Sequence, residues 1–172
     1  MHIQTHILSG WCIANCFPCT PRQRLFAMVA ASAADIDGVV IVFGREAYWT
    51  YHHTFGHNVF TVLLLSGVFA AFTPGRRIGS FLLFLGLFHL HLLMDYYGSG
   101  PDWCIPYLWP LKTMVLRNRS AWEFYSWQNL SVFFVFLLWT IWIARSKRRT
   151  PLEAIMPKLD AELVGLINRE TH

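Results

Sequence analysis

Charged residues are scarce in this chain of 172 residues. Asp, Glu, Lys and Arg together make up 14% of the sequence, whereas a soluble globular domain contains about 25%. Hydrophobic residues make up 55%, so the composition argues against a soluble enzyme and favours an integral membrane protein. Trp and Tyr cluster near the ends of the apolar runs, as they do at membrane–water interfaces.

The sequence also lacks an evenly spread positive charge and an alternation of strand and helix patterns. Its net charge is +4, but most Lys and Arg residues flank apolar segments, which argues against a nucleic-acid partner. Three of its four cysteines, Cys12, Cys16 and Cys19, have the spacing of the cluster ligands in radical SAM enzymes. Those enzymes need a soluble α/β barrel, so we interpret these cysteines as small apolar residues and free thiols near a membrane surface, with a metal or disulfide role as the alternative.

Long apolar runs predict an all-α integral membrane protein with three or four transmembrane helices. The clearest spans are residues 58–73, 78–95 and 127–144, judged against the roughly 20 residues that a span needs. Residues 25–43 are a fourth candidate, but Asp35 and Asp37 would each cost roughly 2.5–3.5 kcal/mol at the centre of a free span. We therefore expect this segment to pack inside the bundle or to lie at the interface. In either place its aspartates need a partner, and a cation is the least costly one.

The remaining segments are expected at the membrane surface, as interfacial helices and one long loop. Residues 96–126 are rich in Gly, Pro, Trp and Tyr and predict a surface loop that covers the site. We divide the chain into a membrane-embedded domain, residues 1–150, and a charged amphipathic tail, residues 151–172. The basic residues at 76–77 and 145–149 predict a cytoplasmic location for both runs and an outer location for the long loop.

Histidine and aspartate residues gather at the outer ends of two consecutive apolar segments. His53 and His57 are four residues apart, and so are His91 and Asp95, so on helices each pair would share a face. If the two segments form an antiparallel hairpin, all four side chains meet at one depth. Ionisable groups at membrane depth are costly and indicate function by default. The sequence therefore predicts a metal centre.

Other side chains compete for a place in this centre. His52 is an alternative to His53, Asp35 and Asp37 add carboxylates, and His6 adds an imidazole. Mixed His and Asp ligands are typical of zinc, with manganese or iron as alternatives.

The order of these motifs resembles that of the YdjM-like inner-membrane metal-dependent hydrolases. Their pattern is an early Thr-His, then Asp-x-Asp, His-Arg-Gly-x-Thr-His-Ser, His-x3-Asp and a Pro-containing loop. The matching residues here are Thr5-His6, Asp35-Ile36-Asp37, the stretch from His52 to Asn58, His91-x3-Asp95 and Leu108-Trp109-Pro110. The third motif departs most, with His53 in place of Arg, Thr54 in place of Gly, Gly56 in place of Thr and Asn58 in place of Ser.

The resemblance implies a location in the bacterial inner membrane and a set of ligands. The family is distantly similar to zinc-dependent phospholipase C and related nucleases, which bind three zinc ions. Their later His and His-x3-Glu ligands have no match here, so the resemblance implies one or two ions, with zinc favoured. The implied ligands are His6, Asp37, His57, His91 and Asp95, and His52, His53 and Asp35 are implied as supporting groups or substitutes.

The resemblance also implies hydrolysis of a phosphoester or ester in an amphiphilic substrate, such as a membrane lipid or a lipid-linked phosphate. A metal lowers the pKa of its water to about 7, and Asp35 or Asp37 is the candidate catalytic base. Arg117, Arg119 and Trp109 are the candidate substrate-binding residues.

Three other functions fit parts of the pattern. The protein could be a membrane protein that binds or moves metal ions or protons without catalysis. It could bind haem through His57 and either His89 or His91, although haem would not need the aspartates. It could also be a scaffold whose site has degenerated, as the altered third motif suggests.

Overall fold

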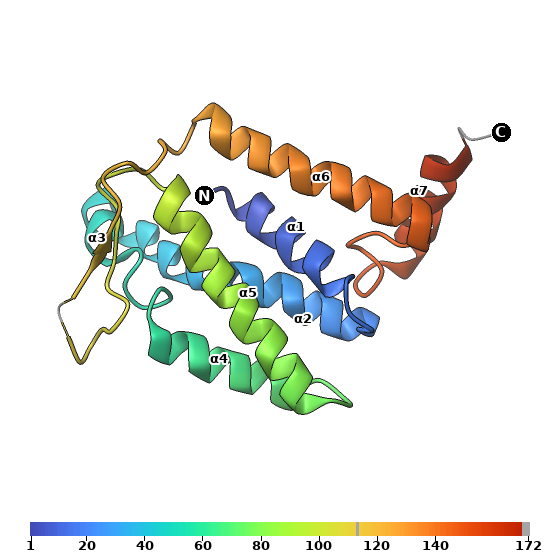
Figure 1. Cartoon of the computed structure of the whole chain (residues 1–172), viewed down its shortest axis with the longest axis horizontal. Helices are drawn as coiled ribbons and strands as arrows, with labels where there is room; N and C mark the ends of the chain where they lie inside the picture. Colours follow the sequence, from blue (N-terminus) through green and yellow to red (C-terminus); the bar gives the residue numbers. More distant parts are fainter. Residues whose placement is uncertain (113, 170–172) are drawn as a thin grey trace.

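Three helical segments are long and apolar enough to cross a membrane, namely Pro21–Phe43, Arg77–Gly98 and Trp127–Lys147. They belong to the bundle seen in the computed structural model, which describes residues 1–112 and 114–169 (Figure 1). The α-helices are α1 (Ile3–Ala14), α2 (Pro21–Ser32), α3 (Arg45–Tyr51), α4 (Val59–Ala71), α5 (Arg77–Gly98), α6 (Trp127–Lys147) and α7 (Pro157–Arg169). A 3-10 helix, η1 (Ala33–Phe43), continues α2. The predicted all-α membrane fold is confirmed.

The set of spans differs from the predicted set in one member. Residues 25–43 fall within a continuous helical segment of 23 residues, although Asp35 and Asp37 interrupt its apolar sequence. The predicted span at 58–73 is a shorter helix, α4, of 13 residues, which is less than the roughly 20 that a straight crossing needs. The α4 helix begins at Val59, where Asn58 caps it by accepting a hydrogen bond from the Thr61 amide, and ends at Ala71.

The α1 helix lies at the centre of the bundle, between α2 and α6 (Figure 1). Its Trp11, Cys12 and Ala14 side chains are buried. A Cβ atom at Gly10 would overlap the carbonyl group of Ala27, so glycine allows α1 and α2 to pack closely. This close approach brings the N-terminal helix against the membrane-length helices.

The α4 and α5 helices form the antiparallel hairpin that the sequence predicts (Figure 1). They are joined by a turn in which Gly75 has a φ of 95°, a value that favours glycine. At the start of α2, Thr20 caps the helix, Pro21 is its first residue, and Gln23 completes a capping box. The turn and the helix start are each determined by residues that are adjacent in the sequence.

The long loop after α5 contains the strands β1 (Cys104–Ile105) and β2 (Leu116–Arg117), which pair antiparallel. Two of the contacts that hold the loop on the bundle involve Tyr107. The Val59 amide donates to the Tyr107 carbonyl at 2.9 Å, and the Tyr107 hydroxyl lies 2.8 Å from His89 Nε2. The loop is thereby held over the end of the bundle where α3 lies (Figure 1).

The C-terminal tail is attached to the bundle by a buried ion pair. Arg24 Nε and Nη2 donate to the two carboxylate oxygens of Glu153 at 2.5 and 2.6 Å, and Trp11 Nε1 donates to Glu153 Oε1 at 3.3 Å. The α7 helix then ends at Arg169, and the last three residues of the predicted tail lie outside the described part of the chain.

We expect the substitution Glu153→Gln to destabilise the protein. Arg24 would keep its charge in a buried position without a carboxylate, and breaking a buried ion pair in this way costs roughly 3–5 kcal/mol. The melting temperature of the detergent-solubilised protein should fall clearly. Glu162→Gln is the matched control, because Glu162 is exposed on the same tail. Equal melting temperatures for the two variants would contradict a structural role for this ion pair.

Candidate metal centre

Four side chains converge near the C-terminal end of α5. Asp35, His57, His91 and Asp95 each offer a ligand atom, and these atoms all lie within 4.8 Å of one another. His91 Nε2 is 3.0 Å from Asp95 Oδ2 and 3.2 Å from His57 Nε2, and His57 Nε2 is 3.2 Å from Asp95 Oδ2. Asp35 Oδ1 lies 3.7 Å from His91 Nε2. This cluster could hold a metal ion.

The outer nitrogens of the two imidazoles in the cluster are both engaged in hydrogen bonds. His91 Nδ1 donates a hydrogen bond to the Ala31 carbonyl at 2.8 Å, and His57 Nδ1 donates to Asp37 Oδ2 at 2.9 Å. These bonds place the protons on the outer nitrogens, as the partners of metal-binding histidines usually do. The Nε2 atoms of both rings then face Asp95, an arrangement that would accommodate a metal ion.

The spacing of these atoms suits a small cation. Ligand atoms at tetrahedral positions about 2.0–2.1 Å from a zinc ion lie about 3.3 Å from one another. The three separations among His57 Nε2, His91 Nε2 and Asp95 Oδ2 are 3.0 to 3.2 Å. All three side chains are buried, whereas Asp35 is partly exposed. The geometry therefore fits three buried ligands and one more open position.

Asp95 occupies the centre of a larger group of imidazoles. His6 Nε2 is 3.2 Å from Asp95 Oδ1, on the side where the Met1 amino group also contacts that oxygen. His53 Nε2 is 3.7 Å from Asp95 Oδ2. His6 Nδ1, His53 Nδ1 and Asp35 Oδ2 are buried and have no hydrogen-bond partner within the described chain. Buried polar atoms are normally satisfied, so these atoms mark further positions for a ligand.

Asp35 and Asp37 lie in different positions relative to the cluster. Asp37, which the family resemblance implies as a ligand, lies behind His57 and accepts hydrogen bonds from His57 Nδ1, from His52 Nδ1 at 2.7 Å and from the Gly56 amide at 3.2 Å. Asp35 faces the cluster instead. Both aspartates belong to η1, and the prediction from sequence had no means of choosing between them.

His91 and Asp95 lie one helical turn apart on α5, as their spacing predicts. The helical placement expected for His53 and His57 is wrong, because residues 52–58 form an irregular segment between α3 and α4. His53 has a left-handed φ of 67°, and a Cβ atom at Gly56 would overlap the backbone of Ala34. Close contact with η1 therefore shapes this segment, and it brings the His53 and His57 rings into a stack 4.1 Å apart.

His53 and His57 have opposite pKa shifts. Burial alone would lower the pKa of His57, but its hydrogen bonds with Asp37 and Asp95 outweigh burial and raise the pKa to about 9. Burial lowers the pKa of His53 well below its usual value, and the nearby His57 lowers it further. Without a metal ion, positive charge is therefore favoured at His57 as a proton between two carboxylates, and a metal ion bound at Nε2 would take the place of that proton.

A cavity of about 340 Å³ opens beside the cluster. Asp35, His53 and Asp95 reach it, and aromatic side chains supply much of its wall, namely Tyr48, Trp49, Trp103, Phe124 and Tyr125. Trp103 stacks on Trp49 with ring centroids 4.7 Å apart and lies 4.9 Å from the His53 ring. The long loop thus covers the site with Trp103. The aromatic richness of the loop indicated in the sequence that it covers the site, but the sequence did not show which aromatic residues contact the site.

The predicted substrate-binding residues lie away from this cavity. Arg117 is exposed on β2 and donates to Cys104 Sγ at 3.0 Å, and Arg119 is also exposed. Trp109 packs edge-on against Phe55 at 5.2 Å. None of the three is among the described residues that line the cavity.

The positions of the histidines do not suit haem. His57 Nε2 and His91 Nε2 are 3.2 Å apart, which leaves no room for a macrocycle between the rings. His89 uses both nitrogens elsewhere, because Nδ1 donates to the Leu85 carbonyl and Nε2 pairs with the Tyr107 hydroxyl.

The chain was compared with known proteins. The sequence profile of a family described as YdjM inner membrane protein matches residues 1–159. The match covers every residue of the cluster and confirms the resemblance seen in the motifs. No curated protein and no solved structure matches the chain.

We expect the cluster to bind one divalent ion per chain or more, and to lose it when a ligand is removed. His91→Ala and Asp95→Ala should abolish metal retention in elemental analysis of the purified protein, because each removes one of three buried ligands. Leu93→Ala is the matched control, since Leu93 is exposed on the same helix outside the cluster. Retention of metal by both cluster variants would contradict the proposed ligand set.

Asp37→Asn should weaken metal binding without abolishing it. The amide keeps the size of the side chain but removes the negative charge that orients His57, and changes to such outer partners cost about 10–100-fold in metal affinity. Competition with a chromophoric chelator measures this affinity. An unchanged affinity would show that Asp37 does not support the site.

Proposed function

We propose that this chain, which belongs to the YdjM inner membrane protein family, is a membrane-bound metal-dependent hydrolase of amphiphilic esters or phosphoesters. One observation carries the proposal. Two imidazole nitrogens and a carboxylate converge around a single point, and this point borders a cavity with an aromatic wall.

Zinc is the ion that we propose for the site. Two histidines and one carboxylate make up the protein ligands of several hydrolytic zinc sites, in which a fourth position stays open for water or substrate. His57, His91 and Asp95 form such a set. Asp95 Oδ1 contacts the Met1 amino group and lies 3.2 Å from His6 Nε2, so a second ion on that side would have to displace the amino group. A bound zinc ion would supply an acidified water and polarise the ester oxygen.

Asp35 is the proposed general base. It lines the cavity, its Oδ1 atom lies 3.7 Å from His91 Nε2, and its Oδ2 atom has no hydrogen-bond partner within the described chain. This oxygen is free to accept a proton from the attacking water. Asp37 fixes the orientation of His57 and stays out of the cavity, so the two aspartates have separate roles.

The cavity is suited to a substrate held at the membrane surface. It lies near the C-terminal end of α5, at one end of a membrane-length helix, and Trp49 and Tyr125 are largely exposed beside it, at 64% and 91%. Trp and Tyr prefer the headgroup region of a bilayer. An ester bond near the headgroup of a lipid or lipid-linked molecule would reach the cluster from there.

A second candidate is a metal-binding scaffold without catalysis. The cavity favours this candidate in one respect, because no Lys or Arg is among its described lining residues. An anionic phosphoester would therefore depend on the metal for charge neutralisation, whereas a carboxylic ester would not. Assays should include both kinds of bond.

We expect the purified protein to hydrolyse a lipid ester or phosphodiester, to lose activity with a chelator, and to regain it with added zinc. Asp35→Asn should lower kcat by about 10²–10⁴-fold, as loss of a general base does, while the protein keeps its metal. Leu93→Ala, on the exposed face of α5, should stay active.

Two results would contradict this proposal. One is activity that persists in chelator and in His91→Ala. The other is a metal-loaded protein that cleaves neither class of lipid bond, which would favour the scaffold.

A further inference from the structure

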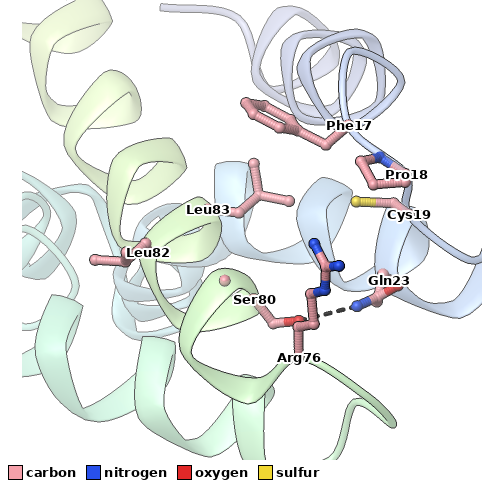
Figure 2. Close-up of a pocket in the computed structure, with 9 residues that line it drawn as sticks. Phe17, Pro18, Cys19, Gln23, Arg76, Ser80, Leu82 and Leu83 are labelled. Carbon is pink, nitrogen blue, oxygen red and sulfur yellow. Dashed lines mark hydrogen bonds between the residues drawn. The ribbon is translucent and has the colours of Figure 1, made fainter.

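A second cavity lies at the opposite end of α5 from the metal centre. Its volume is about 400 Å³, and it is formed where the turn between α1 and α2 meets the first turns of α5 (Figure 2). Phe17, Leu82 and Leu83 supply apolar side chains. Because 16 residues of helix separate Gly79 in this groove from Asp95, the two sites are about 24 Å apart along α5. The groove therefore belongs to the other boundary of the bilayer, whose hydrocarbon core is about 30 Å thick.

The groove has an apolar wall, and Arg76 is the one cationic side chain among its described lining residues. Phe17 and Leu82 are 54% and 59% exposed, so their apolar surface is open to the surroundings. Arg76 extends across the groove toward the turn that contains Cys19 (Figure 2). No acidic residue is among its described lining residues, and no ion pair joins Arg76 to a carboxylate anywhere in residues 1–112 and 114–169.

The floor of the groove is a fixed contact between two helices. Gln23 on α2 donates to Ser80 Oγ on α5 at 3.0 Å, and Ser80 is buried. The polar atoms of the floor are thus partnered by each other. A bound molecule would therefore contact apolar side chains, and Arg76 is the one described lining residue that could pair with a negative charge on it.

We propose that this groove binds an anionic phospholipid of the surrounding bilayer, with the phosphate against Arg76 and an acyl chain along Phe17, Leu82 and Leu83. Apolar walls exclude a small polar ion as the main occupant, and the unpaired guanidinium favours a phosphate over a neutral headgroup. Basic residues near a membrane surface attract anionic lipids. The bound lipid bridges the α1–α2 turn and the α4–α5 hairpin and so stabilises their contact.

The test is native mass spectrometry of the full chain in detergent with added phosphatidylglycerol or phosphatidylcholine, combined with melting temperatures. The wild type should retain phosphatidylglycerol preferentially and melt at a higher temperature with it. Arg76→Gln should lower the affinity about fivefold, since one basic residue contributes about 1 kcal/mol near a membrane surface. Arg77→Gln is the matched control, because Arg77 does not line the groove.

A second variant fills the groove and leaves the charge in place. A Cβ atom at Gly79 would lie 3.8 Å from Arg76 Cβ, which is ordinary contact, so Gly79→Leu should fold and should exclude the acyl chain. Both lipid-binding variants should keep their metal. Equal retention of the two lipids by the wild type, equal loss in Arg76→Gln and Arg77→Gln, or full lipid binding by Gly79→Leu would overturn the proposal. A dimer that Arg76→Gln dissociates would show that a second copy covers this groove.

Discussion

The buried carboxylate of Asp95 is the group around which this bundle is arranged. A carboxylate near the end of an apolar helix is costly unless cations or hydrogen-bond donors surround it. The structure brings His6 from α1, His57 from the segment before α4, and His91 from one turn earlier on α5 to within 3.2 Å of it. Each of these elements must pack closely for the arrangement to exist. The cluster is therefore complete only when these helices are packed together.

Small residues make this packing possible. Glycine at position 10 lets α1 lie against α2, and glycine at position 56 lets the irregular segment lie against the start of η1. The α2 helix in turn offers the Ala31 carbonyl to His91. The same contacts that bury apolar surface thus set the proton positions on the ligands, and they leave Asp35 at the edge of the aromatic cavity as the accessible carboxylate.

The parts of the structure that depend on local sequence were predictable. The cap of α2, the hairpin turn and the shared face of His91 and Asp95 follow from neighbouring residues. The choice between Asp35 and Asp37 did not follow, because it depends on η1 continuing α2 as a 3-10 helix. The path of residues 52–58 was missed for a similar reason, since it is shaped by contact between Gly56 and Ala34, which are distant in sequence. The aromatic cavity wall combines α3 with the long loop, and no local pattern indicates that pairing.

The most direct test of the account is X-ray absorption spectroscopy at the edge of whichever metal co-purifies with the protein. The account predicts a first shell of nitrogen and oxygen atoms at about 2.0–2.2 Å, with the multiple-scattering pattern of at least two imidazoles. A first shell of sulfur atoms at about 2.3 Å would place the metal at the cysteines and contradict the account. Purified protein without any bound metal, even after reconstitution, would contradict it equally.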